Sequence, residues 1–186
     1  INERETLYVS GCYWKDDRGY ADLVKLDWGN ATATLRWNSI INERLFSNTS
    51  LVYSDFNYNV RVNVNENDLR IASRIKNWNL EQDFTYYGWN NHSLRFGLNV
   101  LNQNISPAGI EASASSDVNS LSVDTRQGIE SALYISDEWN ASDRFSMIYG
   151  LRLTNFSVLG PGTFYDFDSD GEAISEQTYG RELVKN

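Results

Sequence analysis

Residues 133–157, LYISDEWNASDRFSMIYGLRLTNFS, alternate between apolar and polar side chains on both sides of one short polar break. Before the break, one parity holds Leu133, Ile135 and Trp139. After it, one parity holds Phe145, Met147, Tyr149, Leu151 and Leu153. A two-residue period marks a β-strand with one polar and one apolar face. The break, NASDR, is long enough only for a hairpin turn, so the stretch predicts two antiparallel strands.

The same period predicts about seven strands in all, and no 3.6-residue period is long enough for a helix. The other five are expected at 6–14, 28–40, 45–62, 69–87 and 93–104. In 69–87 the apolar parity changes near Asn77–Asn79, which a β-bulge or a turn would explain; the bulge is preferred. The expected class is all-β, with antiparallel up-and-down strands.

The connections between these strands are short at one end and mostly long at the other. Short ones are expected at 41–45, 88–92 and 140–144, and the others at 15–27, 63–67, 105–124 and 156–186. Pro107 and Pro161 are both expected in long loops, because proline removes a ladder hydrogen bond from a strand. Short turns opposite long loops are typical of an outer-membrane barrel. Aromatic residues near the short turns fit the girdle of such a barrel: Trp37, Tyr86, Tyr87, Trp89 and Trp139.

Composition excludes several classes of function. No apolar run approaches the ~20 residues of a transmembrane helix, which leaves a β-barrel possible. A formal charge of −9 argues against a nucleic-acid partner. Cys12 is the only cysteine, so this segment cannot form an internal disulfide or a multi-cysteine metal site by itself. His92 is the only histidine, which excludes a His-rich zinc site within the segment, and no Ser-His-Asp triad is expected. No catalytic constellation is present, and no enzymatic activity is expected.

Several stretches together resemble the mid-to-late barrel of TonB-dependent outer-membrane receptors: LYVSGCYWKDD, WGNATATLRWNSI, LEQDFTYY, YISDEWNASDRFSMIYGLRLTNFSVLGPG and YDFDSDGE. The resemblance implies about seven strands of a plugged 22-stranded barrel in the outer membrane of a Gram-negative cell. It implies import of a siderophore, vitamin, glycan or peptide, with energy delivered through TonB. The implied partners are lipid, the rest of the barrel, the plug and a surface lipoprotein.

No stretch matches the plug or the terminal barrel strand of that family. Residues 1–186 are therefore expected to be a partial barrel domain, and the family's transport residues cannot be carried over. In such a barrel one parity faces lipid, which predicts lipid contact for Leu35, Trp37, Leu133, Ile135, Phe145, Met147, Leu151 and Leu153. The opposite parity is expected to line the interior: Asn30, Thr32, Arg36, Glu130, Arg152 and Thr154.

Two polar stretches are candidate sites. Asp166, Asp168 and Asp170, followed by Gly171, match the first half of a calcium-binding EF-hand loop, although Gln177 stands where that loop needs a glutamate. An acidic solvated loop is the simpler interpretation. The stretch around KDDRGY supplies candidate substrate contacts at Trp14, Asp16, Asp17 and Tyr20, because rings and carboxylates suit sugar or peptide binding; a solvated loop is again the simpler interpretation.

A soluble carbohydrate-binding β-sandwich is the alternative, since many strands with exposed aromatic residues describe that class too. The two classes differ in what the apolar parity contacts. In a sandwich it packs on a second sheet of the same chain. In a barrel it contacts lipid, and seven strands leave two unpaired edges.

Overall fold

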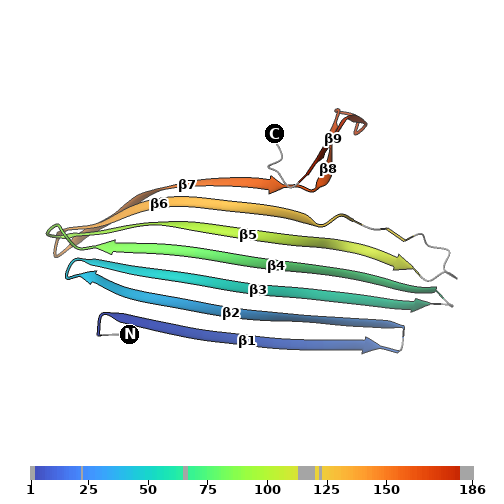
Figure 1. The fold of residues 1–186 in the computed structure, drawn as a ribbon, viewed down its shortest axis with the longest axis horizontal. Helices are drawn as coiled ribbons and strands as arrows, with labels where there is room; N and C mark the ends of the chain where they lie inside the picture. Colours follow the sequence, from blue (N-terminus) through green and yellow to red (C-terminus); the bar gives the residue numbers. More distant parts are fainter. Residues whose placement is uncertain (1–2, 22, 65–66, 113–119, 122, 181–186) are drawn as a thin grey trace.

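The computed structural model describes residues 3–21, 23–64, 67–112, 120–121 and 123–180. Seven antiparallel strands form one sheet in sequence order, so the all-β, up-and-down prediction is confirmed (Figure 1). They are β1 Glu5–Tyr20, β2 Val24–Asn42, β3 Leu45–Val64, β4 Asn67–Tyr86, β5 His92–Ala112, β6 Arg126–Ser142 and β7 Phe145–Leu159. A separate hairpin holds β8 Gly162–Phe167 and β9 Ala173–Tyr179. Within the described ranges, no helix is long and apolar enough to cross a membrane.

We call the end of the sheet with the β2–β3, β4–β5 and β6–β7 connections the near end, and the opposite end the far end. Two of the hairpin turns at the near end have similar structures. The Arg44 amide donates to Asn42 Oδ1 at 2.9 Å, and the Arg144 amide donates to Ser142 Oγ at 3.4 Å. Each turn follows an irregularity in the strand register, between Ile40 and Asn42 and between Asn140 and Ser142. Such side-chain bonds to nearby amides favour turns over continued strand. The predicted hairpin at NASDR is confirmed.

The strands are longer than predicted, and the connections at the opposite, far end are shorter. β1 continues to Tyr20 and β2 begins at Val24, so most of 15–27, expected as a loop, is strand. Charged residues in this stretch do not prevent pairing, because both faces of the sheet are open there. The expected loop 156–186 is also partly wrong, since it contains β8 and β9.

The parity change in β4 has a different cause from either predicted one. Pairing of β3 with β4 is unbroken from Leu45–Tyr86 to Val64–Asn67, so neither a bulge nor a turn lies at Asn77–Asn79. The strand stays regular while its apolar side chains move from one face, at Ile75, to the other, at Leu80.

An irregularity does occur where β4 pairs with β5. Ala72 pairs with Gly109 and Arg74 with Ser106, so β5 holds one extra residue beside Pro107. Pro107 therefore lies in a strand, and its prediction as a loop residue is wrong. A bulge accommodates proline, since the missing N–H falls where the ladder is already interrupted. Pro161 lies between β7 and β8, outside the strands, as predicted.

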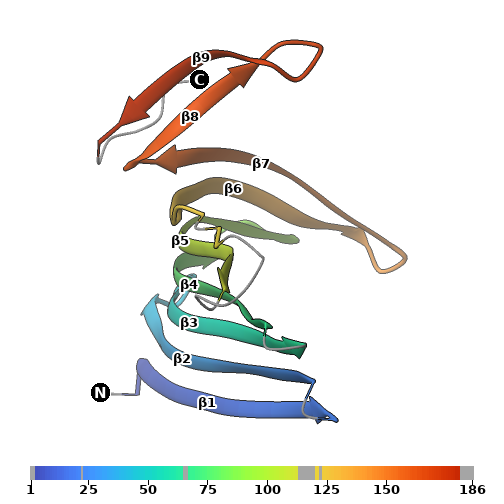
Figure 2. The same ribbon diagram turned by 90° about the vertical axis from the view of Figure 1, so that its right-hand side faces the viewer.

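The sheet is a single layer without a core of its own. Ala132 is the one buried hydrophobic residue in the described part, and no large side chain there is fully buried. The accessible surface is 13568 Å², whereas a compact protein of this mass would expose about 9000 Å². Viewed along the strands, the layer curves, and the β8–β9 hairpin lies beyond β7 rather than over either face (Figure 2). Among the residues that the structure describes, no second layer covers either face of the sheet.

Candidate functional site

The strand register sorts the side chains of the sheet onto two faces of different chemistry. We call one the leucine face, which carries Leu7, Leu35, Leu51, Leu80, Leu98, Leu133 and Leu151. We call the other the amide face, which carries Asn30, Asn38, Asn48, Asn77, Asn79, Asn99 and Gln103.

The residues predicted to contact lipid all lie on the leucine face, and all are exposed. Their exposed fractions range from 41% at Met147 to 80% at Leu151. The six residues predicted for an interior all lie on the amide face. The register thus brings each predicted set together, as strand parity alone indicated.

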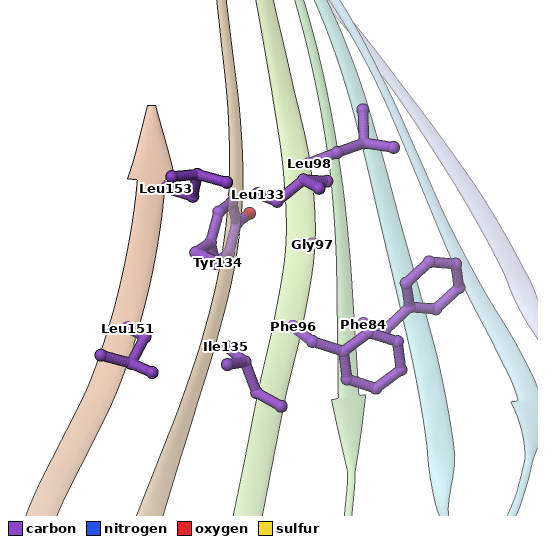
Figure 3. Close-up of a pocket in the computed structure, with 9 residues that line it drawn as sticks. All are labelled: Phe84, Phe96, Gly97, Leu98, Leu133, Tyr134, Ile135, Leu151 and Leu153. Atoms are coloured by element: carbon purple, nitrogen blue, oxygen red, sulfur yellow. The ribbon is translucent and has the colours of Figure 1, made fainter. Parts of the chain in front are cut away.

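Over β4 to β7 the leucine face is mostly apolar. It forms an open hollow of about 460 Å³ (Figure 3), lined by Phe84, Phe96, Leu98, Leu133, Ile135, Leu151 and Leu153 among others. The rings of Phe84 and Phe96 stack with their centroids 5.2 Å apart. The hollow is wide and shallow, so it can be covered by an extended apolar medium rather than enclose a small ligand.

Aromatic residues bound this apolar band at both ends. Towards the far end, Tyr53 and Trp78 lie side by side with ring centroids 4.8 Å apart. Towards the near end, Tyr86 meets Trp89 edge to face at 5.6 Å. Along β4 the band therefore runs from Trp78 to Tyr86. That length is close to the ~9–11 residues with which a tilted strand crosses a bilayer.

The band crosses the strands obliquely. On β1 and β2 its far edge lies at Tyr13 and Ala31. The residues in register with these two on β6 and β7, followed from strand to strand, are Gln127 and Leu159. There, however, the apolar band ends at Leu133 and Leu153, six residues nearer the short turns.

This drift gives the tilt of the strands against the band. A shift of six residues at 3.3 Å each, over five strand spacings of 4.8 Å, corresponds to a tilt of about 40°. Strands of outer-membrane barrels tilt by about 35–45°. The tilt obtained by combining the register with the apolar pattern lies within that range.

Polar side chains inside the band are hydrogen-bonded to one another. Thr49 Oγ1 donates to Gln82 Oε1 at 2.5 Å, and Gln82 Nε2 donates to Ser47 Oγ at 2.8 Å. Pairing of this kind removes most of the cost of a polar group in a medium without water.

A second polar group joins three strands at the near end of the band. Asp137 Oδ2 accepts a hydrogen bond from the Tyr149 hydroxyl and lies close to His92 Nδ1, both at 2.6 Å. The His92 ring stacks on Trp139 with centroids 6.0 Å apart. Sequence reasoning gave His92 no role, because its partners come from β6 and β7 and only the register reveals them.

One row beyond the band, on the same face, Asp55 and Arg74 form a two-point contact. Arg74 Nε donates to Asp55 Oδ1 at 2.7 Å, and Nη2 donates to Oδ2 at 2.5 Å. These hydrogen bonds hold the pKa of the buried Asp55 carboxyl below its usual value and raise the pKa of Arg74. Sequence analysis did not find this pair, whose members lie on different strands.

The amide face carries its own polar contacts. Asn99 Nδ2 donates to Asn79 Oδ1 at 2.8 Å, and Arg36 Nε donates to Ser50 Oγ at 3.3 Å. The Tyr134 hydroxyl donates to Asp83 Oδ1, and the Arg152 guanidinium lies 5.4 Å from the Tyr134 ring centroid. Water or polar protein, but not hydrocarbon, suits this part of the amide face.

The candidate substrate residues lie in β1, not in a loop, and the structure divides them. Trp14, Asp16 and Tyr20 are on the amide face, while Asp17 is on the leucine face. Trp14, Asp16 and Tyr20 are separated by even numbers of residues, so their shared face could have been predicted if the stretch had been recognised as a strand.

The predicted calcium ligands are not brought together. Asp168 Oδ1 accepts hydrogen bonds from the amides of Asp170 and Glu172, both at 2.9 Å, and so closes the β8–β9 turn. Asp166 accepts a hydrogen bond from the Ser175 hydroxyl across the hairpin. Among the residues that the structure describes, no three His, Cys, Asp or Glu side chains are grouped to hold a metal ion. The Asp168 carboxylate thus shapes the turn and the Asp166 carboxylate bonds across the hairpin, roles that the sequence motif alone does not reveal.

Comparisons with models of protein families, with curated proteins and with solved structures found no match. The functional argument therefore rests on the two faces of the sheet.

Proposed function

We propose that this chain is part of the wall of an outer-membrane barrel of the TonB-dependent receptor type, which imports a nutrient into a Gram-negative cell. The observation that carries the proposal is the exposed apolar band, bounded by aromatic rings, on a sheet without a core. Fully burying one large apolar side chain contributes about 1.5–3 kcal/mol, so an open band of this size needs a covering medium. Lipid is the medium whose thickness matches the band.

The sandwich alternative lacks the sheet it needs. A second sheet should pack on the leucine face, but the second sheet in the described part is β8–β9, with strands of six and seven residues. Among the described residues, β8 and β9 pack extensively on each other, and neither packs extensively on a strand of the large sheet. The band therefore has no partner of the required size among the described residues.

The two edges of the sheet support closure by further strands. β1 and β7 both run from the near end to the far end. Their outer neighbours in an antiparallel barrel must both run the opposite way, which requires an odd number of additional strands. A 22-stranded barrel would add roughly 15 to these seven, in agreement with that rule.

The transport activity is proposed from the resemblance to TonB-dependent receptors. In that assignment the amide face lines the lumen and meets water or the plug. The plug would receive energy through TonB, and a surface lipoprotein is a further proposed partner. The polar and hydrogen-bonded character of the amide face supports this orientation.

Paired cysteine substitutions on β7 test the proposal in the full-length protein in its membrane. With Cys12→Ser as background, Leu153→Cys should react only with a lipid-soluble maleimide. Thr154→Cys, its neighbour on the other face, should react with a membrane-impermeant reagent supplied from outside. Equal reaction of both positions with the impermeant reagent would contradict the barrel, because it would place the leucine face in water.

A further inference from the structure

The two faces of the sheet exchange their chemistry beyond the apolar band. In the far half, apolar pairs lie on the amide face, such as Val60 with Ile71 and Val62 with Leu69. The leucine face there is polar, with Asn57 opposite Arg74. Lipid cannot explain apolar residues on the amide face, because they lie beyond the band and on its opposite side. They indicate a second surface with a different occupant.

The part of this surface on β1 to β3 is aromatic, and we call it the aromatic strip. Asp16, Trp28 and Tyr58 are direct neighbours across the three strands, and Trp14 pairs with Asn30. Tyr20 lies four residues beyond Asp16 on the same face. The strip therefore consists of Trp14, Asp16, Tyr20, Trp28, Asn30 and Tyr58.

The rings of the aromatic strip remain available for a ligand. Trp14 is 40% exposed and Tyr20 is 76% exposed, while Trp28 and Tyr58 are half-buried. In the described part of the chain, none of the four rings packs on another ring. Their surroundings supply hydrogen-bonding groups, such as Asn30, whose Oδ1 already accepts from Ser54 Oγ at 3.4 Å.

The charge of the amide face restricts what the strip could bind. Over the seven strands that face carries five arginines, Arg18, Arg36, Arg95, Arg126 and Arg152. It also carries five acids, Asp16, Glu81, Asp83, Glu130 and Glu138. The opposite signs balance, although the whole chain has a net charge of −9. This part of the wall has no net charge, so it provides no single-sign field to attract an anionic or a cationic cargo to the strip.

We propose that the aromatic strip binds an uncharged oligosaccharide on its way into the barrel. Sugar rings have an apolar C–H side, which packs on aromatic faces, and hydroxyl groups, which suit the carboxylate of Asp16 and the amide of Asn30. Apolar walls with a few polar groups are typical of ligand sites. The strip extends about 20 Å along β1 and about 10 Å across the strands, the shape of a linear saccharide chain.

This inference rests on the proposed function, because it requires the amide face to line an import path. Within that function it selects a glycan as the cargo. The chain also offers matched controls, because Trp78 and Tyr53 are the same residue types as Trp28 and Tyr58 but lie on the leucine face.

Binding by the purified full-length receptor in detergent tests the inference. Isothermal titration with a panel of neutral oligosaccharides (α-glucan, β-glucan, mannan and xylan fragments) should reveal at least one ligand. Trp28→Ala should lower the affinity for that ligand by roughly three- to tenfold, as expected for the loss of one aromatic contact. Trp28→Phe should retain most of the affinity, and Trp78→Ala should leave it unchanged.

Three results would overturn the saccharide assignment. The first is that no oligosaccharide of the panel binds. The second is equal weakening by Trp28→Ala and Trp78→Ala. The third is tighter binding of uncharged peptides that depends on Trp28. Each of these, in a receptor whose Leu153 and Thr154 label as proposed above, would remove the glycan and leave the barrel. Failure of the labelling itself would remove the proposed function.

Discussion

Adjacent residues of β7 have opposite surroundings. Leu151 projects from the leucine face with 80% of its surface exposed, whereas Arg152 places its guanidinium over the Tyr134 ring on the amide face. The strand period of two places these side chains on opposite sides of a single layer. A substitution at one position should therefore have a different cost from the same kind of substitution at the next.

Leu151→Arg should destabilise the folded receptor by roughly 2–4 kcal/mol, because a charge on the lipid face near the bilayer midplane is costly. Thr154→Arg, on the amide face, should cost much less. Urea unfolding of the full-length receptor in lipid vesicles measures both free energies. Similar costs at the two positions would indicate that both faces contact the same medium.

The Asp55–Arg74 pair predicts a pH dependence that one substitution should remove. Arg74 lowers the pKa of Asp55 in the folded state, so the folded state binds this proton less readily than the unfolded chain does. The contribution of the pair to stability is therefore present above the unfolded pKa, about 3.9, and is lost as the pH falls through the lower folded value. Stability should thus decline more steeply below about pH 4 in the wild type than in Asp55→Asn.

Urea unfolding midpoints between neutral and acid pH provide the measurement. Glu111→Gln serves as the control, because it breaks the Arg70–Glu111 pair, whose side chains are 44% and 73% exposed. Exposed ion pairs of this kind contribute about 0–1 kcal/mol, so this variant should follow the wild type. An acid limb that is the same in Asp55→Asn and the wild type would exclude Asp55 as its source.

At the scale of strands and turns, the sequence predicted pairing better than it predicted strand ends. The hairpin of β6 and β7 was predicted because one face of its near half is apolar at nearly every second residue. The end of β1 was missed because residues 15–18, KDDR, are charged on both parities and show no two-residue period. The start of β2, VKLDW, does alternate, but its apolar side chains lie on the amide face instead of the leucine face. The same change of apolar side explains the apparent slip in β4, where the strand itself is regular.

One long side chain from β6 contacts the β8–β9 hairpin in two ways. Arg126 Nη2 donates to the Thr163 carbonyl at 3.1 Å, and its guanidinium lies 4.6 Å from the Phe164 ring centroid. A Cβ at Gly162 would lie 2.0 Å from Arg126 Nη1, so a side chain there would force the guanidinium to move. Arg126 therefore holds the hairpin against the end of the sheet.

Arg126→Gln should loosen this hairpin without unfolding the sheet. The lost hydrogen bond and cation–π contact together correspond to roughly tenfold faster hydrogen exchange for the amides of 162–179. Arg152→Gln is the matched control, since it also removes a cation–π contact but lies far from the hairpin in β7. Exchange in the hairpin that is equally fast in both variants would show that Arg126 does not hold it.

At the scale of the whole molecule, some features of the two faces could be predicted from the sequence and others could not. Parity predicted which residues share the apolar face, because alternation is a local property. The tilt of about 40°, the charge balance of the amide face and the aromatic strip all depend on which residues of different strands are neighbours. Those neighbours follow from the register, which is fixed by turns and bulges such as the one beside Pro107.

The last prediction follows from the open faces and edges of the sheet. Expressed without a membrane and without flanking strands, residues 1–186 should aggregate rather than form a soluble monomer. Two causes contribute: the exposed apolar band, and the unpaired backbone groups along β1 and β7. Size-exclusion chromatography and thermal melting followed by circular dichroism provide the measurement.

A second variant separates the two causes. Replacing Leu133, Leu151 and Leu153 by threonine keeps strand propensity but removes much of the apolar surface over β6 and β7. This variant should aggregate more slowly yet still fail to melt cooperatively, because its edges remain unpaired and no core is gained. A wild-type segment that is monomeric and melts cooperatively would contradict the barrel, since its leucine face would then have to be covered by the chain itself, as in a sandwich.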